Sequence, residues 1–109
     1  MEIYDPVANT WSAGPVMSPR APTRAARLGT DGRIYLAGGY TGSNYQATAV
    51  ALVPATGIYA PIGSLNVSHG YTQLAALGDG RILAIAGSNT SSMYLTRVEA
   101  YTPASDAWR

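Results

Sequence analysis

A four-residue sequence that occurs twice constrains the fold of this chain more than any other feature. Asp-Gly-Arg-Ile stands at 31–34 and again, 48 residues later, at 79–82. Pro6 is likewise followed by Pro54 and Pro103, at spacings of 48 and 49 residues. A period of about 50 residues, with short β-strands inside each unit, is typical of repeat proteins whose units pack on one another. We therefore predict two equivalent units, with the extra residues placed in loops.

The residues inside each unit predict short strands joined by turns. Asp31-Gly32 and Asp79-Gly80 are two-residue sequences of the kind that joins antiparallel strands in a hairpin. No segment shows a sustained helical period, so we predict an all-β fold of about two four-stranded antiparallel units. Strands are expected at 2–5, 10–13, 23–28, 33–37, 72–77, 81–86 and, for the beginning of a last one, 107–109. In each unit we also expect a strand that closes on a proline, Pro54 or Pro103, before a turn into an aromatic residue.

The composition excludes several classes of partner and site. The chain has 109 residues, enough for one ordinary domain, and a formal net charge of +1. All seven basic residues are scattered arginines, so no basic tract exists that would follow a nucleic-acid backbone. No apolar run approaches the length of a membrane span. Cysteine is absent, which excludes thiolate sites and leaves the compartment undetermined. We expect no nucleic-acid or membrane partner, no cofactor and no metal.

Several sequence elements resemble the kelch repeat family, and the resemblance covers nearly the whole chain. The first unit carries most of the pattern. The second unit departs from it with Ala86-Gly87 in place of two glycines, Leu52-Val53-Pro54 in place of Tyr-Asp-Pro, and Tyr59 in place of Trp. The resemblance implies blades of a β-propeller, each blade a four-stranded sheet. The elements that carry it are Asp31-Gly32-Arg33-Ile34-Tyr35 followed by Gly38-Gly39, Tyr4-Asp5-Pro6 followed by Asn9-Thr10-Trp11, and Val98-Glu99-Ala100-Tyr101 before Pro103.

The same resemblance implies that the chain is an incomplete propeller. Propellers close with about 4–8 blades, so two units leave the outer faces of the first and last sheets uncovered. We assign 1–22 to the end of a preceding blade and the loop after it, 23–63 to one blade, and 64–109 to a loop and a next blade that stops in its last strand. The implied partners are the remaining blades of the same protein, or further copies of the chain in a self-associated ring.

Most positions that recur with the repeat have a structural interpretation. Trp11, Tyr59 and Trp108 occupy one repeat position and are expected to pack between adjacent sheets. Arg33 and Arg81 follow the tight turns and are expected to pair with a backbone group or a carboxylate. Recurring glycines are expected to permit turns, positive φ or close backbone approach. These glycines are Gly32, Gly38, Gly39, Gly80 and Gly87.

Recognition is expected at the longer loops, because variable loops on rigid strands are the usual place for it. Alternating strand directions put the loops at 14–22, 40–46, 63–71 and 88–94 on one face, which we call the long-loop face, and the two tight turns on the other. The residue types in these loops, Tyr, Asn and Arg among them, form adaptable polar interfaces. The candidate binding residues are Arg20, Arg24, Tyr40, Asn44, Tyr45, Asn66, His69, Tyr71, Asn89 and Tyr94.

His69 is the only histidine of the chain, and it follows Ser68. A serine beside a histidine suggests a nucleophile and its base. Adjacent residues on an extended strand point to opposite faces, however, so the two side chains are poorly placed to hydrogen-bond. We therefore interpret His69 as a surface contact, and we predict no catalytic residue in this chain.

Two classes of function follow. The first is a scaffold that binds a protein or glycan ligand through the long-loop face, as the resemblance implies. The alternative is a fragment of a propeller enzyme, since galactose oxidase-like copper proteins and sialic-acid mutarotases are built on kelch-like repeats. The copper site would need several histidines and a cysteine-modified tyrosine, and the mutarotase site would need acids that the long loops lack. Under this alternative, the catalytic residues would lie outside the chain.

Overall fold

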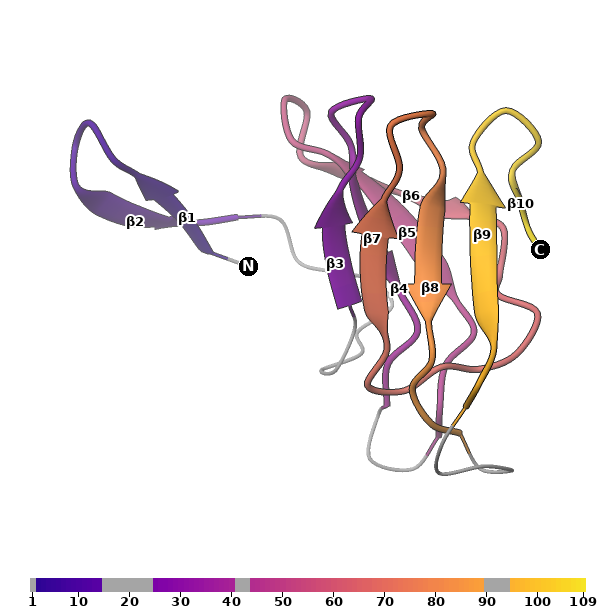
Figure 1. Ribbon diagram of the computed structural model, residues 1–109. Helices are drawn as coiled ribbons and strands as arrows, with labels where there is room; N and C mark the ends of the chain where they lie inside the picture. The colour runs from indigo at the N-terminus through magenta and orange to yellow at the C-terminus, as the bar shows by residue number, and fades with distance from the viewer. Residues whose placement is uncertain (1, 15–24, 41–43, 90–94) are drawn as a thin grey trace.

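The computed structural model describes residues 2–14, 25–40, 44–89 and 95–109, and over these ranges the fold is all-β (Figure 1). These ranges form ten strands in three antiparallel sheets, without a helix and so without a helix able to cross a membrane. The strands are β1 (Glu2–Asp5), β2 (Thr10–Ala13), β3 (Ala25–Leu28), β4 (Ile34–Ala37), β5 (Ala49–Val53), β6 (Ile58–Ile62), β7 (Gln73–Ala76), β8 (Ile82–Ile85), β9 (Val98–Thr102) and β10 (Ala107–Trp108).

Two of the sheets have four strands each, in the order β3-β4-β5-β6 and β7-β8-β9-β10. Strands that follow one another in the chain are neighbours in the sheet, so each sheet is a simple meander. Both predicted tight turns join the first two strands of a sheet, where Leu28 pairs with Ile34 and Ala76 pairs with Ile82. The prediction of an all-β chain with two four-stranded units is therefore confirmed.

The main core lies between these two sheets, which pack face to face. Side chains alternate across a strand, so every second residue of β4 and β8 points into this core. Trp108 is 5% exposed there and donates its indole N–H to the carbonyl of Gly63 over 2.7 Å. Its predicted place between sheets is confirmed. The buried core residues are Tyr35, Ala37, Ala49, Ala51, Leu65, Leu74, Ile82, Ala84, Tyr101 and Trp108.

The opposite face of the first four-stranded sheet carries a second apolar cluster. Leu36, Val50 and Leu52 are buried in it, and Ile34 and Tyr59 pack against them. Tyr59 is half-buried, and the loss of hydration raises the pKa of its hydroxyl. The repeat therefore places an aromatic residue of each four-stranded sheet on the side that faces the preceding unit.

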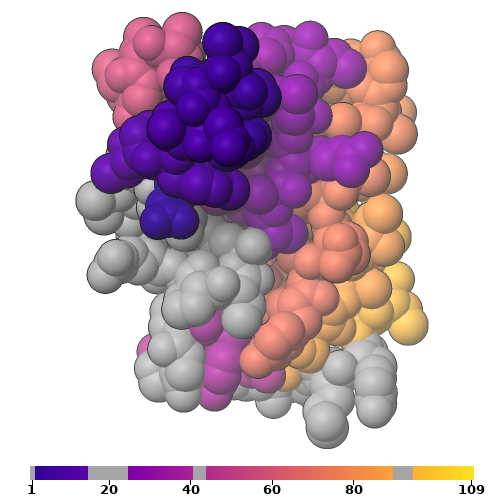
Figure 2. Space-filling model, turned by 90° about the vertical axis from the view of Figure 1, so that its left-hand side faces the viewer, coloured from indigo at the N-terminus to yellow at the C-terminus, as the bar shows by residue number. Residues whose placement is uncertain are grey.

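The hairpin of β1 and β2 forms a sheet of its own, which stands apart from the two packed sheets in Figure 1 and lies in front of the first four-stranded sheet in Figure 2. Its Trp11 is 65% exposed, so the prediction that Trp11 packs between sheets is wrong for this chain. The reason follows from the equivalent Trp108, which packs on the sheet that precedes it in the chain. No sheet of the described residues precedes β1, so the corresponding face of the hairpin has nothing to pack on.

The backbone after β4 and after β8 has the same left-handed conformation, although one glycine is replaced. Gly38 and Gly39 have φ of +69° and +111°, and the equivalent Ala86 and Gly87 have +54° and +103°. A methyl group at Gly38 would collide with the carbonyl oxygen of His69, whereas Ala86 is accommodated. Positive φ occurs at Gly38, Gly39 and Gly87, where it was one of the expected roles, and also at the turn glycines Gly32 and Gly80.

Candidate functional site

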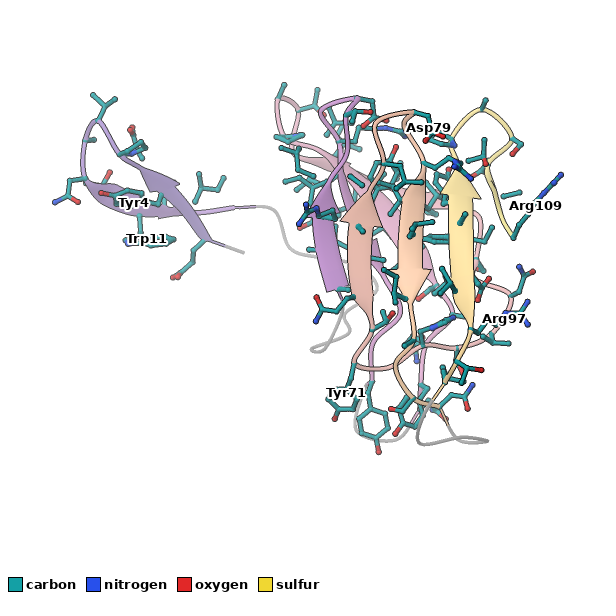
Figure 3. All side chains as sticks on the ribbon, in the orientation of Figure 1. Tyr4, Trp11, Tyr71, Asp79, Arg97 and Arg109 are labelled. Carbon is teal, nitrogen blue, oxygen red and sulfur yellow. The ribbon has the colours of Figure 1, made fainter. Side chains whose placement is uncertain are left out.

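The described parts of the long loops and the tight turns lie at opposite ends of the two stacked sheets, as the strand order requires. In Figure 3, Asp79 marks the end with the tight turns and Tyr71 marks the end with the long loops. Three of the candidate binding residues, Arg20, Arg24 and Tyr94, lie outside the described residues.

The backbone of His69 joins the two sheets at the long-loop end. Its carbonyl accepts the N–H of Gly39 over 2.8 Å, and its N–H donates to the carbonyl of Gln46 over 3.1 Å. The next residue continues this contact into the second sheet, where Gly70 and Ser88 exchange two backbone hydrogen bonds. The segment that enters β7 is therefore fastened to the ends of both sheets.

The side chain of His69 is completely buried, which corrects the prediction of a surface contact. Nδ1 lies 2.7 Å from the carbonyl oxygen of Ala86, and Nε2 lies 2.8 Å from Oε2 of Glu99. A carbonyl oxygen only accepts hydrogen bonds, so Nδ1 carries a proton and donates. Nε2 faces a carboxylate oxygen, so a proton lies between these two atoms, and His69 and Glu99 form a buried hydrogen-bonded pair.

Glu99 is also fully buried, and backbone groups satisfy the rest of its carboxylate. Oε1 accepts the N–H of Asn66 over 2.7 Å, and Oε2 accepts the N–H of Val67 over 3.2 Å. Arg97 Nε lies 3.8 Å from Oε2, on a half-exposed side chain. Burial alone would raise the pKa of this carboxyl, but the Asn66 N–H, the His69 ring and the Val67 N–H lower it below its ordinary value. Glu99 thus holds the loop 66–69 from beneath.

Sequence reasoning missed the role of Glu99, although a signal was present. Glu2 and Glu99 stand at the same position of the repeat, two residues before Tyr4 and Tyr101. The corresponding residue of the first four-stranded sheet is Val50, which is buried among apolar side chains. The buried pair of His69 and Glu99 therefore belongs to the second sheet and is not a general feature of the repeat.

Three tyrosines gather at the long-loop end, and we call them the tyrosine cluster: Tyr40, Tyr45 and Tyr71. The ring centroid of Tyr40 lies 4.6 Å from that of Tyr45 and 6.3 Å from that of Tyr71. Tyr45 packs on Gly70, where no side chain would fit. Tyr71 is 60% exposed and has a φ of +55°, an unusual backbone conformation for a bulky residue. The structure thus brings together three of the predicted candidates and presents one of them to solvent.

The predicted asparagines divide into two kinds. The amide of Asn66 donates to the carbonyl of Trp108 over 2.9 Å, and that of Asn89 donates to the carbonyl of Ser68 over 3.2 Å. Both amides therefore help to hold the loops in place. Asn44 is exposed next to the tyrosine cluster.

The tight-turn end contains ion pairs that stabilise the turns. Arg33 Nε lies 3.0 Å from Asp31, and Arg81 Nε lies 2.9 Å from Asp79, which confirms the pairing predicted for both arginines. Tyr35 donates its hydroxyl to Asp31 over 2.6 Å. Burial, together with this hydrogen bond, raises the pKa of Tyr35 to about 12. These groups are fully engaged with one another, and they close the turn.

A cleft of about 510 Å³ lies between the hairpin and the first four-stranded sheet. Its walls are mostly apolar, and Glu2 is the one charged residue among the described residues that line it. The lining residues are Glu2, Ile3, Tyr4, Ile34, Leu52, Pro54 and Gly57. The cleft is the space between the hairpin and the next sheet, on the face opposite to the main core.

No family model matches this sequence, and no curated protein matches it. Among solved structures, the chain is similar to a novel fungal alcohol oxidase of the AA5 family, solved in complex with copper. The TM-score is 0.78 at 23% sequence identity, and the match covers 99% of this chain. The two proteins share a fold. The match spans only 22% of the oxidase chain.

The described residues do not fit a copper site like the one that the oxidase complex suggests. They contain no group of three or more His, Cys, Asp or Glu side chains that could hold a metal ion. The chain has a single histidine and no cysteine, and both nitrogens of that histidine already face protein acceptors. A metal at His69 would have to displace Glu99 or Ala86 inside the core.

Proposed function

We propose that this chain forms two blades of a kelch-type β-propeller and binds a protein or glycan ligand through the long-loop face. The observation that carries the proposal is the tyrosine cluster, with Tyr71 exposed above a loop that the buried pair of His69 and Glu99 holds in place. Aromatic rings with a polar edge suit both sugar faces and protein side chains. A rigid base beneath them lowers the entropy that binding has to offset.

The backbone of Tyr71 supports a functional rather than a structural reason for this residue. A non-glycine residue with positive φ carries strain that persists only where the surrounding structure determines it, and such residues cluster at ligand sites. Its ring contributes little to the core, being 60% exposed. A contact between the Tyr71 ring and a ligand would offset the free-energy cost of this backbone strain.

The proposal is tested with Tyr71→Asn, because asparagine tolerates positive φ and the substitution removes the ring without new backbone strain. The intact protein and this variant are compared on a glycan array and against a displayed peptide library. Thr30→Ala, at the exposed tight-turn end, is the matched control. Tyr71→Asn is expected to lose the bound ligands, and Thr30→Ala to keep them. The proposal fails if Thr30→Ala abolishes binding while Tyr71→Asn retains it.

A second candidate is a blade pair of a propeller oxidase, which the similarity to the alcohol oxidase favours. In that case residues outside 1–109 supply the copper ligands, because the described residues do not fit such a site. The long-loop face then borders an active site built elsewhere. Copper titration of the 109-residue chain tests a premise that both candidates share: stoichiometric tight binding would show that the chain itself carries the ligands, contrary to both.

A further inference from the structure

An exposed aromatic pair on the hairpin of β1 and β2 has the same geometry as a buried pair in the second sheet. Tyr4 and Trp11 are cross-strand partners with ring centroids 5.1 Å apart and an interplanar angle of 47°. Tyr101 and Trp108 are cross-strand partners 5.2 Å apart at 45°. Tyr4 is 42% exposed and also lines the cleft toward the first four-stranded sheet, and Trp11 is 65% exposed. The hairpin therefore presents largely to solvent a surface that the second sheet buries.

The turns that join these strands agree as well. The hydroxyl of Tyr4 donates to Asn9 over 2.6 Å, and that of Tyr101 donates to Asp106 over 2.7 Å. Asn9 and Asp106 have positive φ of 54° and 49°. The hairpin is thus a preformed copy of the β9–β10 hairpin, and its aromatic pair needs no rearrangement to make the same contacts.

The buried pair shows what such a surface packs against. Tyr101 and Trp108 lie on the inner face of the first four-stranded sheet, which we call the receiving face. The rings of Tyr101 and Tyr35 are 5.8 Å apart across this contact. The residues of the receiving face are Tyr35, Ala37, Ala49 and Ala51.

The second sheet has an equivalent receiving face, which is uncovered. One repeat further along the chain, the same four positions hold Leu83, Ile85, Val98 and Ala100. Ile85 is 37% exposed and Val98 is 52% exposed. In Figure 1 the strands β7, β8 and β9 lie in front of the other four-stranded sheet, so their receiving face is turned away from that sheet, and no described strand covers it.

We propose that the Tyr4–Trp11 face of one copy of this chain docks on the Leu83–Val98 face of a second copy. The internal contact between the two four-stranded sheets is the template, because both new surfaces are its repeat equivalents. Both are apolar, so burying them is favourable. Because the two surfaces differ, the contact is heterologous, and successive copies add head to tail into a ring or an open chain. This proposal is independent of the ligand-binding function proposed above.

The test uses sedimentation velocity of the full 109-residue chain over a range of concentrations from micromolar to near-millimolar. The wild type is expected to associate as its concentration rises. Trp11→Ser removes the docking ring, and Val98→Arg places a charge in the receiving face. Each variant alone is expected to weaken association about 30-fold or more, the effect of removing a central aromatic anchor. Val7→Ser, at a 95% exposed position of the same hairpin, is the control and should associate like the wild type.

Mixing the two variants tests the head-to-tail geometry itself. Trp11→Ser retains an intact receiving face, and Val98→Arg retains an intact aromatic pair, so an equimolar mixture should form a one-to-one dimer and stop there. Circular dichroism of each variant, recorded first, shows whether the sheets are intact. The proposal is overturned if the wild type stays monomeric at all concentrations, which would leave only a neighbouring blade of a longer protein for these faces. It is also overturned if the folded variants associate normally, or if their mixture stays monomeric.

Discussion

Replacing Glu99 by valine tests the buried pair of His69 and Glu99 beneath the long-loop face. Valine is the residue at the equivalent position of the first sheet, Val50, so the substitution suits the apolar surroundings. It removes the acceptor of three donors: the ring of His69 and the N–H groups of Asn66 and Val67. What remains is a buried ring that keeps its contact with Ala86 at Nδ1 but has lost its partner at Nε2.

The expected loss follows from that geometry. Removing one partner of a buried pair of this kind costs about 3–5 kcal/mol, because the groups that faced it stay buried and lose their hydrogen bonds. The total free energy of unfolding of a domain is about 5–15 kcal/mol, so the variant loses a large part of its stability. Removing the ring as well, in the double variant Glu99→Val and His69→Leu, should recover part of the loss, because apolar replacements of a whole buried pair are often well tolerated.

Urea unfolding followed by circular dichroism measures these differences. Arg81→Ala is the matched control, because it breaks an ion pair whose side chains are 46% and 56% exposed and which water already screens. The control is expected to shift the unfolding midpoint only slightly. The reasoning is refuted if Glu99→Val is as stable as Arg81→Ala, or if the double variant is less stable than Glu99→Val alone.

Three further predictions follow from the same structure. Ala86→Gly should stabilise the protein by up to about 1 kcal/mol, because glycine adopts the positive φ at this position without strain. Gly38→Ala should destabilise the protein, because the added methyl group would collide with the carbonyl oxygen of His69. Thermal melts would contradict this reasoning if Gly38→Ala melted at a higher temperature than Ala86→Gly. Trp108→Ala should lower the free energy of unfolding by about 3–5 kcal/mol, because it leaves a cavity in the core. Trp11→Ala should lower it by less than about 1.5 kcal/mol, because it removes only an exposed contact between two rings. Equal losses of stability in dilute solution would contradict the difference in burial between the two tryptophans. The pKa of Glu99 is lowered in the folded protein, so the ionised carboxylate stabilises the fold above the ordinary pKa of 4.5, and this stabilisation is lost as the pH falls below that value. On acidification, the urea midpoint of Glu99→Gln should therefore decrease less than that of the wild type. A decrease of equal size would contradict the lowered pKa of Glu99.

The sequence predicted the elements whose causes are local or repeated. The Asp-Gly turns at 31–32 and 79–80 determine which strands are neighbours, and the repeat determines which sheet each strand joins. The exposure of Trp11 was not predictable from its own repeat position, because burial there depends on a sheet on the other side of the hairpin. The burial of His69 was missed for a similar reason. Its partner Glu99 is 30 residues away, and only the folded contact between sheets brings them together.

The binding role of the long-loop face stays a prediction, and so do the domain boundaries within 1–109. Composition alone favoured polar loop residues as contacts, yet Asn66 and Asn89 donate hydrogen bonds to the backbone of the protein itself. Only the fold distinguishes such internal donors from an exposed ring like that of Tyr71. Residue type in a loop is therefore weaker support than the exposure and strain that the structure adds.

The central claim is that two repeated sheets pack face to face and hold the loops at one end. Nuclear Overhauser effects between the rings of Tyr35 and Tyr101 measure that packing directly, because these residues come from different sheets and their centroids lie 5.8 Å apart. We predict clear cross-peaks between the two rings, together with cross-strand effects within β3–β6 and within β7–β10. Cross-strand effects in both sheets without any between Tyr35 and Tyr101 would contradict the account.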